Sequence, residues 1–378
     1  MRIAHISDPH LGYRAYNRVN REGVNVREAD VFQAFRRALA QVRRIEPDLV
    51  VIAGDLFHVV RPSNLTIQHA FRELAQLTTT LRAPLVILGG NHDSPRSADT
   101  GCILDLYANL PGVRVAHNDY VQVKLPELNT SVFCLCHRAL PRLSSLKIEP
   151  DASSAHNVLL AHGTVEGVLR NPYDLIEISR SQVISDSWDY IAFGHYHMFE
   201  ELAPNAFYAG SLEYTSTNIW SETGQSKGFV EYDLEARRIV QFHEIATREV
   251  VDLRPIDAAG LTAADLNRMI AQRVESVPGG WANKIIRLVV ENVVRPVQAD
   301  LDYAAVRAIR ADALHFDLQL RPPARDRRIR SDADYGPSRP LEDEWDGFAA
   351  ARELPPGVDR DRLKTLGREY LARQLQME

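Results

Sequence analysis

The sequence predicts an α/β (α+β) protein with two β-rich layers flanked by helices, then a small α+β domain and a helical tail. Short apolar runs alternate with helical patterns in the first part of the chain, and consecutive strand-like runs follow. The pattern resets after these strands and breaks again at a Pro- and Arg-rich stretch. The 378 residues also exceed what one core usually holds. We therefore expect three segments, at residues 1–245, 246–322 and 323–378.

The first part carries three short apolar runs, "IAHIS", "LVVIA" and "LVIL", that predict strands. A helix is expected over residues 29–47, because Val31, Phe32, Phe35, Leu39, Val42 and Ile45 recur at helical spacing and Pro47 ends the pattern. A second helix is expected from Ser63, a good N-cap, to about residue 82, before Pro84. A third is expected over 97–110, ended by Pro111.

The next part is predicted to be strand-rich, with the runs "VRVAH", "YVQVKL", "SVFCLCH", "NVLLAH", "DYIAFGHYH", "AFYAGS", "GFVEYDL" and "RIVQFHEI". The small domain is expected to hold helices near 262–275 and 301–311 between strands. The segment 321–340 reads as a linker. Two short helices separated by "PPG" follow it, and the second bears an apolar stripe of Leu363, Leu366, Tyr370, Leu371 and Leu375.

Composition excludes some classes of protein. No apolar run reaches the roughly 18 residues of a membrane span, so no membrane association is expected, and the N-terminus lacks a secretory pattern. Three cysteines do not suggest a disulfide framework, and Cys134 and Cys136 are expected to be buried strand residues rather than metal ligands. A cytoplasmic location fits these features. The net charge of −6 lacks the basic footprint of most nucleic-acid binders.

Polar residues follow five of the predicted strands. They are Asp8 and His10, Asp55 with His58 three residues later, Asn91 and His92, His162, and His195 and His197. The carboxyl ends of strands in open α/β sheets meet in one crevice. In extended chain, residues i and i+2 point the same way, so the D-x-H and H-x-H pairs each direct two side chains at one place. Each motif alone is a weak signal, whereas five in order are a strong one.

The donor types indicate a pair of metal ions. Neutral His, carboxylate and amide oxygens without Cys suit Mn, Fe or Zn. Seven ligands are too many for one ion, but they suit two ions about 3.5–4 Å apart that share one carboxylate. Glycines precede Asp55, Asn91 and His195, where the backbone must turn closely.

The ordered set "DPH … GD … GNHD … H … GHYH" resembles the calcineurin-like metallophosphoesterase superfamily over about residues 1–245. The resemblance implies a four-layer α/β/β/α sandwich. It implies that one metal is bound by Asp8, His10, Asp55 and His197, and the other by Asp55, Asn91, His162 and His195. It also implies that His92 contacts the reacting phosphate, that Asp93 orients His92, and that hydroxide held by the metals attacks phosphorus in line with the leaving oxygen.

A narrower resemblance concerns the substrate. "HISDPHLGYR" and "IAGDLFHVVRPSN" are similar to the SbcD family, the nuclease subunit of a DNA double-strand-break repair complex. This resemblance implies a Mn²⁺-dependent 3′–5′ exonuclease and an endonuclease on single strands and hairpins, with His58 assisting catalysis. Pro9 departs from the family pattern, but Pro tolerates extended geometry, so its neighbouring ligands should be undisturbed.

The same resemblance implies partners. Residues 246–320 would form a capping domain over DNA, and the C-terminal helices would dock on an SbcC-type ATPase. The alternative for the apolar stripe of the tail is a helix packed on the chain's own core. Homodimerisation is expected through the helices near 63–82 and 97–110. Tyr13 and Arg14 are candidate substrate-binding residues in an Arg-rich loop, residues 12–27, which either meets DNA phosphates or is simply solvated.

Two alternative functions remain open from the sequence. One is a phosphodiesterase of nucleotides or other small phosphoesters, which would leave DNA intact. The other is a non-catalytic scaffold for DNA ends, which predicts missing ligands, whereas here every matched ligand is present. The acidic net charge argues against DNA, and basic surface supplied by a partner ATPase would resolve that conflict.

Overall fold

The computed structural model describes the chain except for residues 96, 98–99, 169–175, 324–340, 352–357 and 376–378. It contains two compact units, Met1–Arg321 and Pro322–Glu378. Within the described residues, no helix is both long and apolar enough to span a bilayer.

The first unit is built on two six-stranded sheets. The first sheet has the order β14-β13-β1-β2-β3-β4 and the second β11-β12-β10-β7-β6-β5. In the first, β1 to β4 are parallel and β13 runs antiparallel to β1. In the second, β6, β7, β10 and β12 are parallel. The strands of the first sheet are β1 (Arg2–Ile6), β2 (Leu49–Ala53), β3 (Leu85–Leu88), β4 (Val113–Ala116), β13 (Gly228–Asp233) and β14 (Arg238–Glu244). Those of the second are β5 (Tyr120–Leu125), β6 (Thr130–Leu135), β7 (His156–His162), β10 (Tyr190–Gly194), β11 (Glu200–Ala203) and β12 (Ala206–Tyr208).

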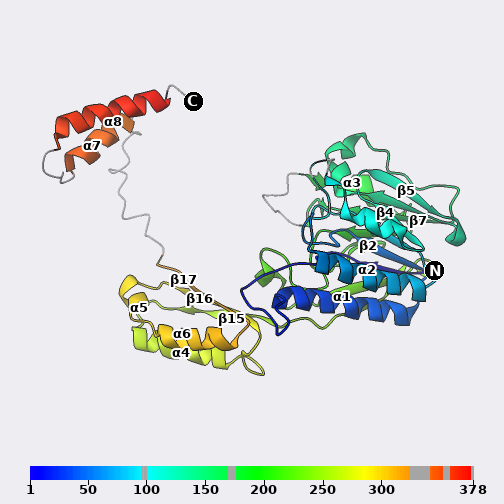
Figure 1. Ribbon diagram of the computed structural model, residues 1–378, viewed down its shortest axis with the longest axis horizontal. Coiled ribbons are helices and arrows are strands. Elements are labelled where there is room, and N and C mark those ends of the chain that lie inside the picture. Colours follow the sequence, from blue (N-terminus) through cyan, green and yellow to red (C-terminus); the bar gives the residue numbers. More distant parts are fainter. Residues whose placement is uncertain (96, 98–99, 169–175, 324–340, 352–357, 376–378) are drawn as a thin grey trace. The chain divides into compact units, whose positions relative to one another are not determined.

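Alternate residues of each strand pack on opposite faces of its sheet. Ile3, Val51 and Ala53 pack between the two sheets against Val158 and Leu160. Their neighbours along the strands point outwards to helices α1 (Val26–Ile45) and α2 (Asn64–Thr80), which lie along one face of the body (Figure 1). The outer face of the second sheet is covered by the shorter η4 (His137–Ser145), α3 (Arg180–Val183) and the two-stranded sheet of β8 (Thr164–Val165) and β9 (Glu177–Ile178). This arrangement confirms the predicted four-layer sandwich.

The prediction of an α-helix over residues 97–110 is wrong. The described part forms only a short 3₁₀ helix, η2 (Ile103–Asn109). Gly101 has a φ of +67° and Cys102 is extended, so the chain cannot continue a helix through them. By contrast, α1 and α2 lie within about three residues of their predicted bounds, and Ser63 accepts the Thr66 N–H as the predicted N-cap.

The small domain, within the first unit, has a parallel three-stranded sheet in the order β15-β16-β17. Helices α4 and α6 cover one face of it (Figure 1), where Ile286, Leu288 and Val290 of β16 pack against both helices. Its elements are β15 (Val250–Asp257), α4 (Ala263–Glu275), β16 (Ile285–Glu291), α5 (Arg295–Ala299), α6 (Tyr303–Asp312) and β17 (His315–Leu320). Ile285 and Leu314 contact the body through a second apolar cluster with Tyr214 and Ile219.

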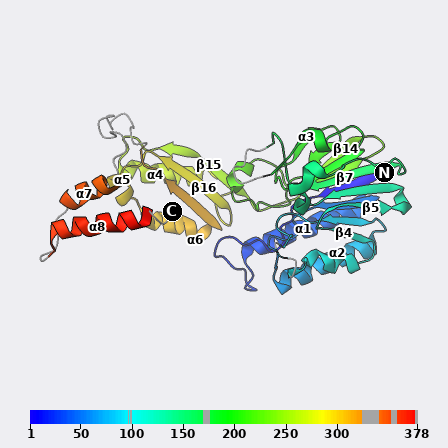
Figure 2. The ribbon, with the colours of Figure 1, turned by 90° about the horizontal axis from the view of Figure 1, so that it is seen from above.

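The second unit is a pair of helices, α7 (Leu341–Ala351) and α8 (Arg360–Leu375), which lie side by side in both views (Figures 1 and 2). Trp345 Nε1 donates to the carbonyl of Lys364 at 3.2 Å and joins the two helices. Of the predicted apolar stripe, Leu366 and Tyr370 are exposed, at 56% and 66%. The side chain of Leu375 and most of the predicted linker lie outside the described residues.

Candidate metal centre

The seven predicted ligands come together where the strands of both sheets end. Asp8 and His10 follow β1, Asp55 follows β2 and Asn91 follows β3. In the second sheet His162 ends β7, while His195 and His197 follow β10. Because β1, β2 and β3 are parallel, as are β7 and β10, these residues lie at a common edge of the sandwich.

The backbone turns sharply at the ligands. Asp8, His10 and Asp55 have φ values of +49°, +48° and +49°, and His195 has +100°. Residues other than Gly adopt such angles rarely and at a cost of about 1–3 kcal/mol, and they gather at functional sites. The turns are held by neighbouring backbone, since His10 N–H donates to the carbonyl of Asp55 at 2.9 Å.

The glycines before the ligands were predicted to allow close turns, but of the three only Gly54 has a positive φ, of +91°, and what all three share is close packing. A Cβ on Gly54 would lie 2.1 Å from His162 Nδ1, and one on Gly90 would lie 2.1 Å from Asp55 Oδ1. A Cβ on Gly194 would lie 1.8 Å from the carbonyl oxygen of Ala53. The two sheets therefore touch at the site, and only glycine allows that approach.

The donor atoms of the predicted ligands form two groups that meet at Asp55, and a third possible group joins His10 to His58 and His92. Asp8, His10 and His197 make one group, and Asp55, His162 and His195 make the other, each with ligand atoms within 4.8 Å of one another. His10 Nε2 and His197 Nε2 are 3.0 Å apart. Asp55 Oδ2 lies 3.3 Å from His162 Nε2 and 3.7 Å from His10 Nε2, so one carboxylate oxygen faces both groups.

Asn91 completes the second group. Its Oδ1 lies 3.0 Å from His162 Nε2 and 3.1 Å from His195 Nδ1. His162 Nδ1 donates to the carbonyl of Ala53 at 2.8 Å, which fixes the tautomer and leaves the Nε2 lone pair directed into the cluster. The predicted sharing of seven ligands between two sites thus has a counterpart in the geometry.

The charges of the cluster call for cations. Asp8 and Asp55 are buried, and among the described residues neither forms an ion pair with Lys or Arg. Burial raises the pKa of Asp8 to about 6. Burial also opposes the charge on Asp55, but the neighbouring His162 outweighs it and holds the pKa of Asp55 well below its usual range. Buried carboxylates of this kind are normally paired or coordinate metals.

The histidines suit metal binding as well. Burial lowers the pKa of His10 to about 3 and that of His197 well below its usual value, so both are neutral ligands near pH 7. Burial alone would do the same to His162, but the charges of Asp55 and Asp8 raise its pKa to about 9. His162 therefore lies beside two carboxylates that favour positive charge at this point of the cluster, and the donor set fits two divalent ions.

His92 and His58 lie beside the first group. His92 Nδ1 donates to the carbonyl of His58 at 2.7 Å, and its backbone N–H donates to Asp55 Oδ1 at 2.8 Å. His58 Nδ1 is 3.3 Å from His10 Nδ1, and the rings of His58 and His92 stack at 5.1 Å. Burial lowers the pKa of His58 to about 4.

Asp93 does not have the role expected of it. Its buried carboxylate accepts backbone N–H groups of Leu56, Phe57 and Gly90 at 2.9–3.2 Å, and His92 is instead oriented by the carbonyl of His58. Asp93 therefore fastens the loop after β2 to the loop after β3. Both loops carry ligands, so its effect on the site is indirect.

The Arg-rich loop is only partly available to a ligand. Tyr13 lies edge-on to the His58 ring at 4.9 Å, close to the cluster. Arg14 pairs with Glu28 at 2.7 Å but stays more than half exposed. Arg27 is buried against Glu213, and Arg18 donates to the carbonyls at the C-terminal end of α6, so these two arginines are engaged within the protein.

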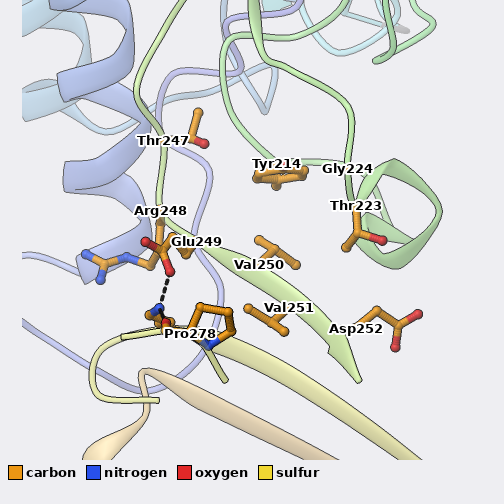
Figure 3. Close-up of a pocket in the computed structure, with 11 residues that line it drawn as sticks. Tyr214, Thr223, Gly224, Thr247, Arg248, Glu249, Val250, Val251, Asp252 and Pro278 are labelled. Atoms are coloured by element: carbon orange, nitrogen blue, oxygen red, sulfur yellow. Dashed lines mark hydrogen bonds and ion pairs between the residues drawn. The ribbon is translucent and has the colours of Figure 1, made fainter. Parts of the chain in front are cut away.

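A cavity of about 580 Å³ lies beside the start of β15 (Figure 3). Thr223, Tyr214 and the first residues of β15 line it, and an ion pair between Glu249 and Lys284 closes one side. None of the predicted ligands lines this cavity.

Sequence reasoning missed a buried group around His197. The Nζ of Lys227 donates to the carbonyl of His197 at 2.7 Å and pairs with Glu222. Thr215 Oγ1 lies 3.4 Å from His197 Nδ1. These residues are 18 to 30 positions from His197 and follow no strand-end pattern, so the sequence carried no signal for them.

Comparison with known proteins agrees with this centre. Two relatives are named DNA double-strand break repair protein Mre11. The one from Methanococcus maripaludis is 28% identical over 249 residues, covering 62% of this chain and 63% of the relative. The one from Methanocaldococcus jannaschii is 26% identical over 285 residues, covering 70% and 72%. Residues 1–199, which include every predicted ligand from Asp8 to His197, match the calcineurin-like phosphoesterase family. The chain therefore belongs to the calcineurin-like phosphoesterase family.

Proposed function

We propose that this protein is a DNA nuclease of double-strand break repair, cleaving phosphodiester bonds with two divalent ions, most suitably Mn²⁺. The observation that carries the proposal is the complete set of seven donors gathered around Asp55. The similarity to two Mre11 proteins supports DNA as the substrate. We assign one ion to Asp8, His10, Asp55 and His197, and the other to Asp55, Asn91, His162 and His195.

The chemistry divides between the ions and the chain. Two bound cations would supply a water that is deprotonated near neutral pH and would stabilise negative charge on the phosphoryl oxygens. Because His92 Nδ1 is engaged by the carbonyl of His58, its Nε2 is left to contact the reacting phosphate. His58, stacked on His92, fixes the plane of that ring. Tyr13, beside His58, and the exposed Arg14 are proposed to contact the DNA backbone.

The proposal includes two protein interfaces. A groove of about 610 Å³ on α2 and η2 is lined by Ile67, Gln68, Phe71, Arg72, Ala75 and Leu106, and it is almost wholly apolar. We propose this groove as part of a homodimer interface. The exposed Phe348, Leu366 and Tyr370 of the helix pair are proposed to dock on an SbcC-type ATPase. Residues 246–322 would cap the DNA.

A nuclease assay tests the substrate. The full chain is incubated with end-labelled duplex and hairpin DNA in Mn²⁺, Mg²⁺ or EDTA, beside bis(p-nitrophenyl) phosphate. The proposal expects Mn²⁺-dependent shortening of DNA from 3′ ends, absent in EDTA and in His92→Ala. A matched control is His156→Ala, at the opposite end of the strand that ends in His162. Intact DNA with cleavage of the small diester would replace the nuclease by a small-molecule phosphodiesterase.

A further inference from the structure

A buried Lys–Glu pair lies directly behind one of the proposed metal ligands. Glu222 and Lys227 are each 3% exposed, and Thr215 beside them is 4% exposed. A buried ion pair is weak evidence for stability, because desolvation offsets most of the attraction. Its position is therefore the more informative property.

Every donor of Lys227 has a partner, and the partners surround His197. The Nζ of Lys227 donates to the carbonyl of His197 at 2.7 Å, to Ser211 Oγ at 3.0 Å and to the Glu222 carboxylate. Ser211 N–H donates to the same carbonyl at 3.1 Å. Lys227 thus holds both the backbone of the ligand and the acid behind it.

The ring of His197 is oriented from both sides. Its Nε2 faces His10 Nε2 at 3.0 Å, inside the metal cluster. Its Nδ1 faces Thr215 Oγ1 at 3.4 Å and Glu222 Oε1 at 3.9 Å. Thr215 Oγ1 donates its own proton to the carbonyl of Glu213 at 3.4 Å, so it is left to accept from His197 Nδ1. The Glu222 carboxylate is too distant for a direct hydrogen bond but favours a proton on Nδ1 electrostatically, and this leaves the Nε2 lone pair for a metal.

We propose that Glu222 is a positioning residue for His197, held in place by Lys227 and acting on Nδ1 together with Thr215. The inference rests on the metal centre of the proposed function. Groups of this kind fix the tautomer and plane of a ligand, and their loss typically weakens metal binding 10- to 100-fold. The affinity for the ion bound by His197 should fall, and the affinity for the other ion should stay unchanged.

The test measures metal binding rather than turnover. Metal-free full-length protein is titrated with Mn²⁺ while free Mn²⁺ is followed by electron paramagnetic resonance, for the wild type and Glu222→Gln. The matched control is Glu231→Gln, since Glu231 is equally buried and pairs with Arg2 and His243, away from the cluster. In parallel, ¹⁵N-histidine NMR of the metal-free protein reports which nitrogen of His197 carries the proton.

The inference expects two Mn²⁺ ions in the wild type, one of them bound 10- to 100-fold more weakly in Glu222→Gln, and the Nδ1–H tautomer of His197 reduced in that variant. Thr215→Val should weaken the same ion. The double variant E222Q/K227M removes both charges of the pair, so it leaves no unpaired buried charge. It should weaken the binding of the same ion. If these variants bind two Mn²⁺ ions with affinities within twofold of the wild type, the inference is refuted while the metal centre itself stands. A wild type that binds fewer than two ions would instead refute the metal centre.

Discussion

Gly194 is the position at which the two sheets press most closely on the metal centre, so Gly194→Ala is a sharp test of the packing. The added Cβ would lie 1.8 Å from the carbonyl oxygen of Ala53, which is backbone, and 2.9 Å from His162 Nδ1. A Cβ essentially never approaches a heavy atom closer than 3.0 Å, so the β10 and β2 ends must separate by about 1.2 Å.

Two consequences follow from this separation. Overpacking of this kind costs about 1–3 kcal/mol in the free energy of unfolding. His195 follows Gly194 directly and Asp55 lies two residues beyond Ala53, so a shift of this size moves ligands of the second group apart. Sites of this type need their side chains held within about 0.5 Å. We therefore expect Mn²⁺ affinity to fall far more than the stability alone would suggest.

The assay pairs urea unfolding in EDTA with calorimetric Mn²⁺ titration. The control is Gly112→Ala, where φ is +73° but nothing lies within 4 Å of the added Cβ. That variant should lose about 1–2 kcal/mol from its backbone angle and keep both metal sites. Gly194→Ala with wild-type Mn²⁺ affinity would refute the close contact between the sheets at the centre.

His92→Ala should retain two Mn²⁺ ions by calorimetry and lose about 10²- to 10⁴-fold in kcat on bis(p-nitrophenyl) phosphate, and loss of metal would contradict its assignment. The pKa of His162 is raised to about 9 in the metal-free fold, so the free energy of unfolding in EDTA should fall by up to about 3 kcal/mol as the pH rises from 6.5 to 9. A urea midpoint that does not change over this pH range would contradict the prediction. Leu106→Glu should convert a dimer to a monomer in light scattering, and a persistent dimer would move the interface elsewhere. Asp93→Asn, which loses a carboxylate acceptor of backbone N–H groups, should destabilise the fold by about 1–3 kcal/mol in urea, and an unchanged midpoint would be inconsistent with its role.

Much of the fold was predictable because its signals are local. The apolar runs and caps of the first part predict β1 to β3, α1 and α2 from their own residues, and the strand-end pattern predicts which polar side chains meet. The predicted family and hydrolase class are confirmed by the match over residues 1–199. The prediction of a helix over residues 97–110 was wrong because Gly101 adopts a left-handed backbone conformation, which a helix cannot pass through, whatever the helical pattern after it.

The surroundings of the ligands were not predictable in the same way. The partner of His92 is a backbone carbonyl, at His58, which no side-chain pattern reveals. The Lys227–Glu222 pair meets His197 only because β12 and β13, in different sheets, bring distant segments together. From the sequence, the arginines of the Arg-rich loop were expected to be exposed to solvent or to DNA. Arg18 instead donates hydrogen bonds to backbone carbonyls at the end of α6, nearly 300 residues away along the chain.

The most direct test of the central claim is the anomalous diffraction of crystals grown with Mn²⁺. The account predicts two anomalous peaks about 3.5–4 Å apart, with the Asp55 carboxylate between them, one peak near His10 and His197 and the other near His162 and His195. A single peak, or peaks outside this cluster, would contradict the account.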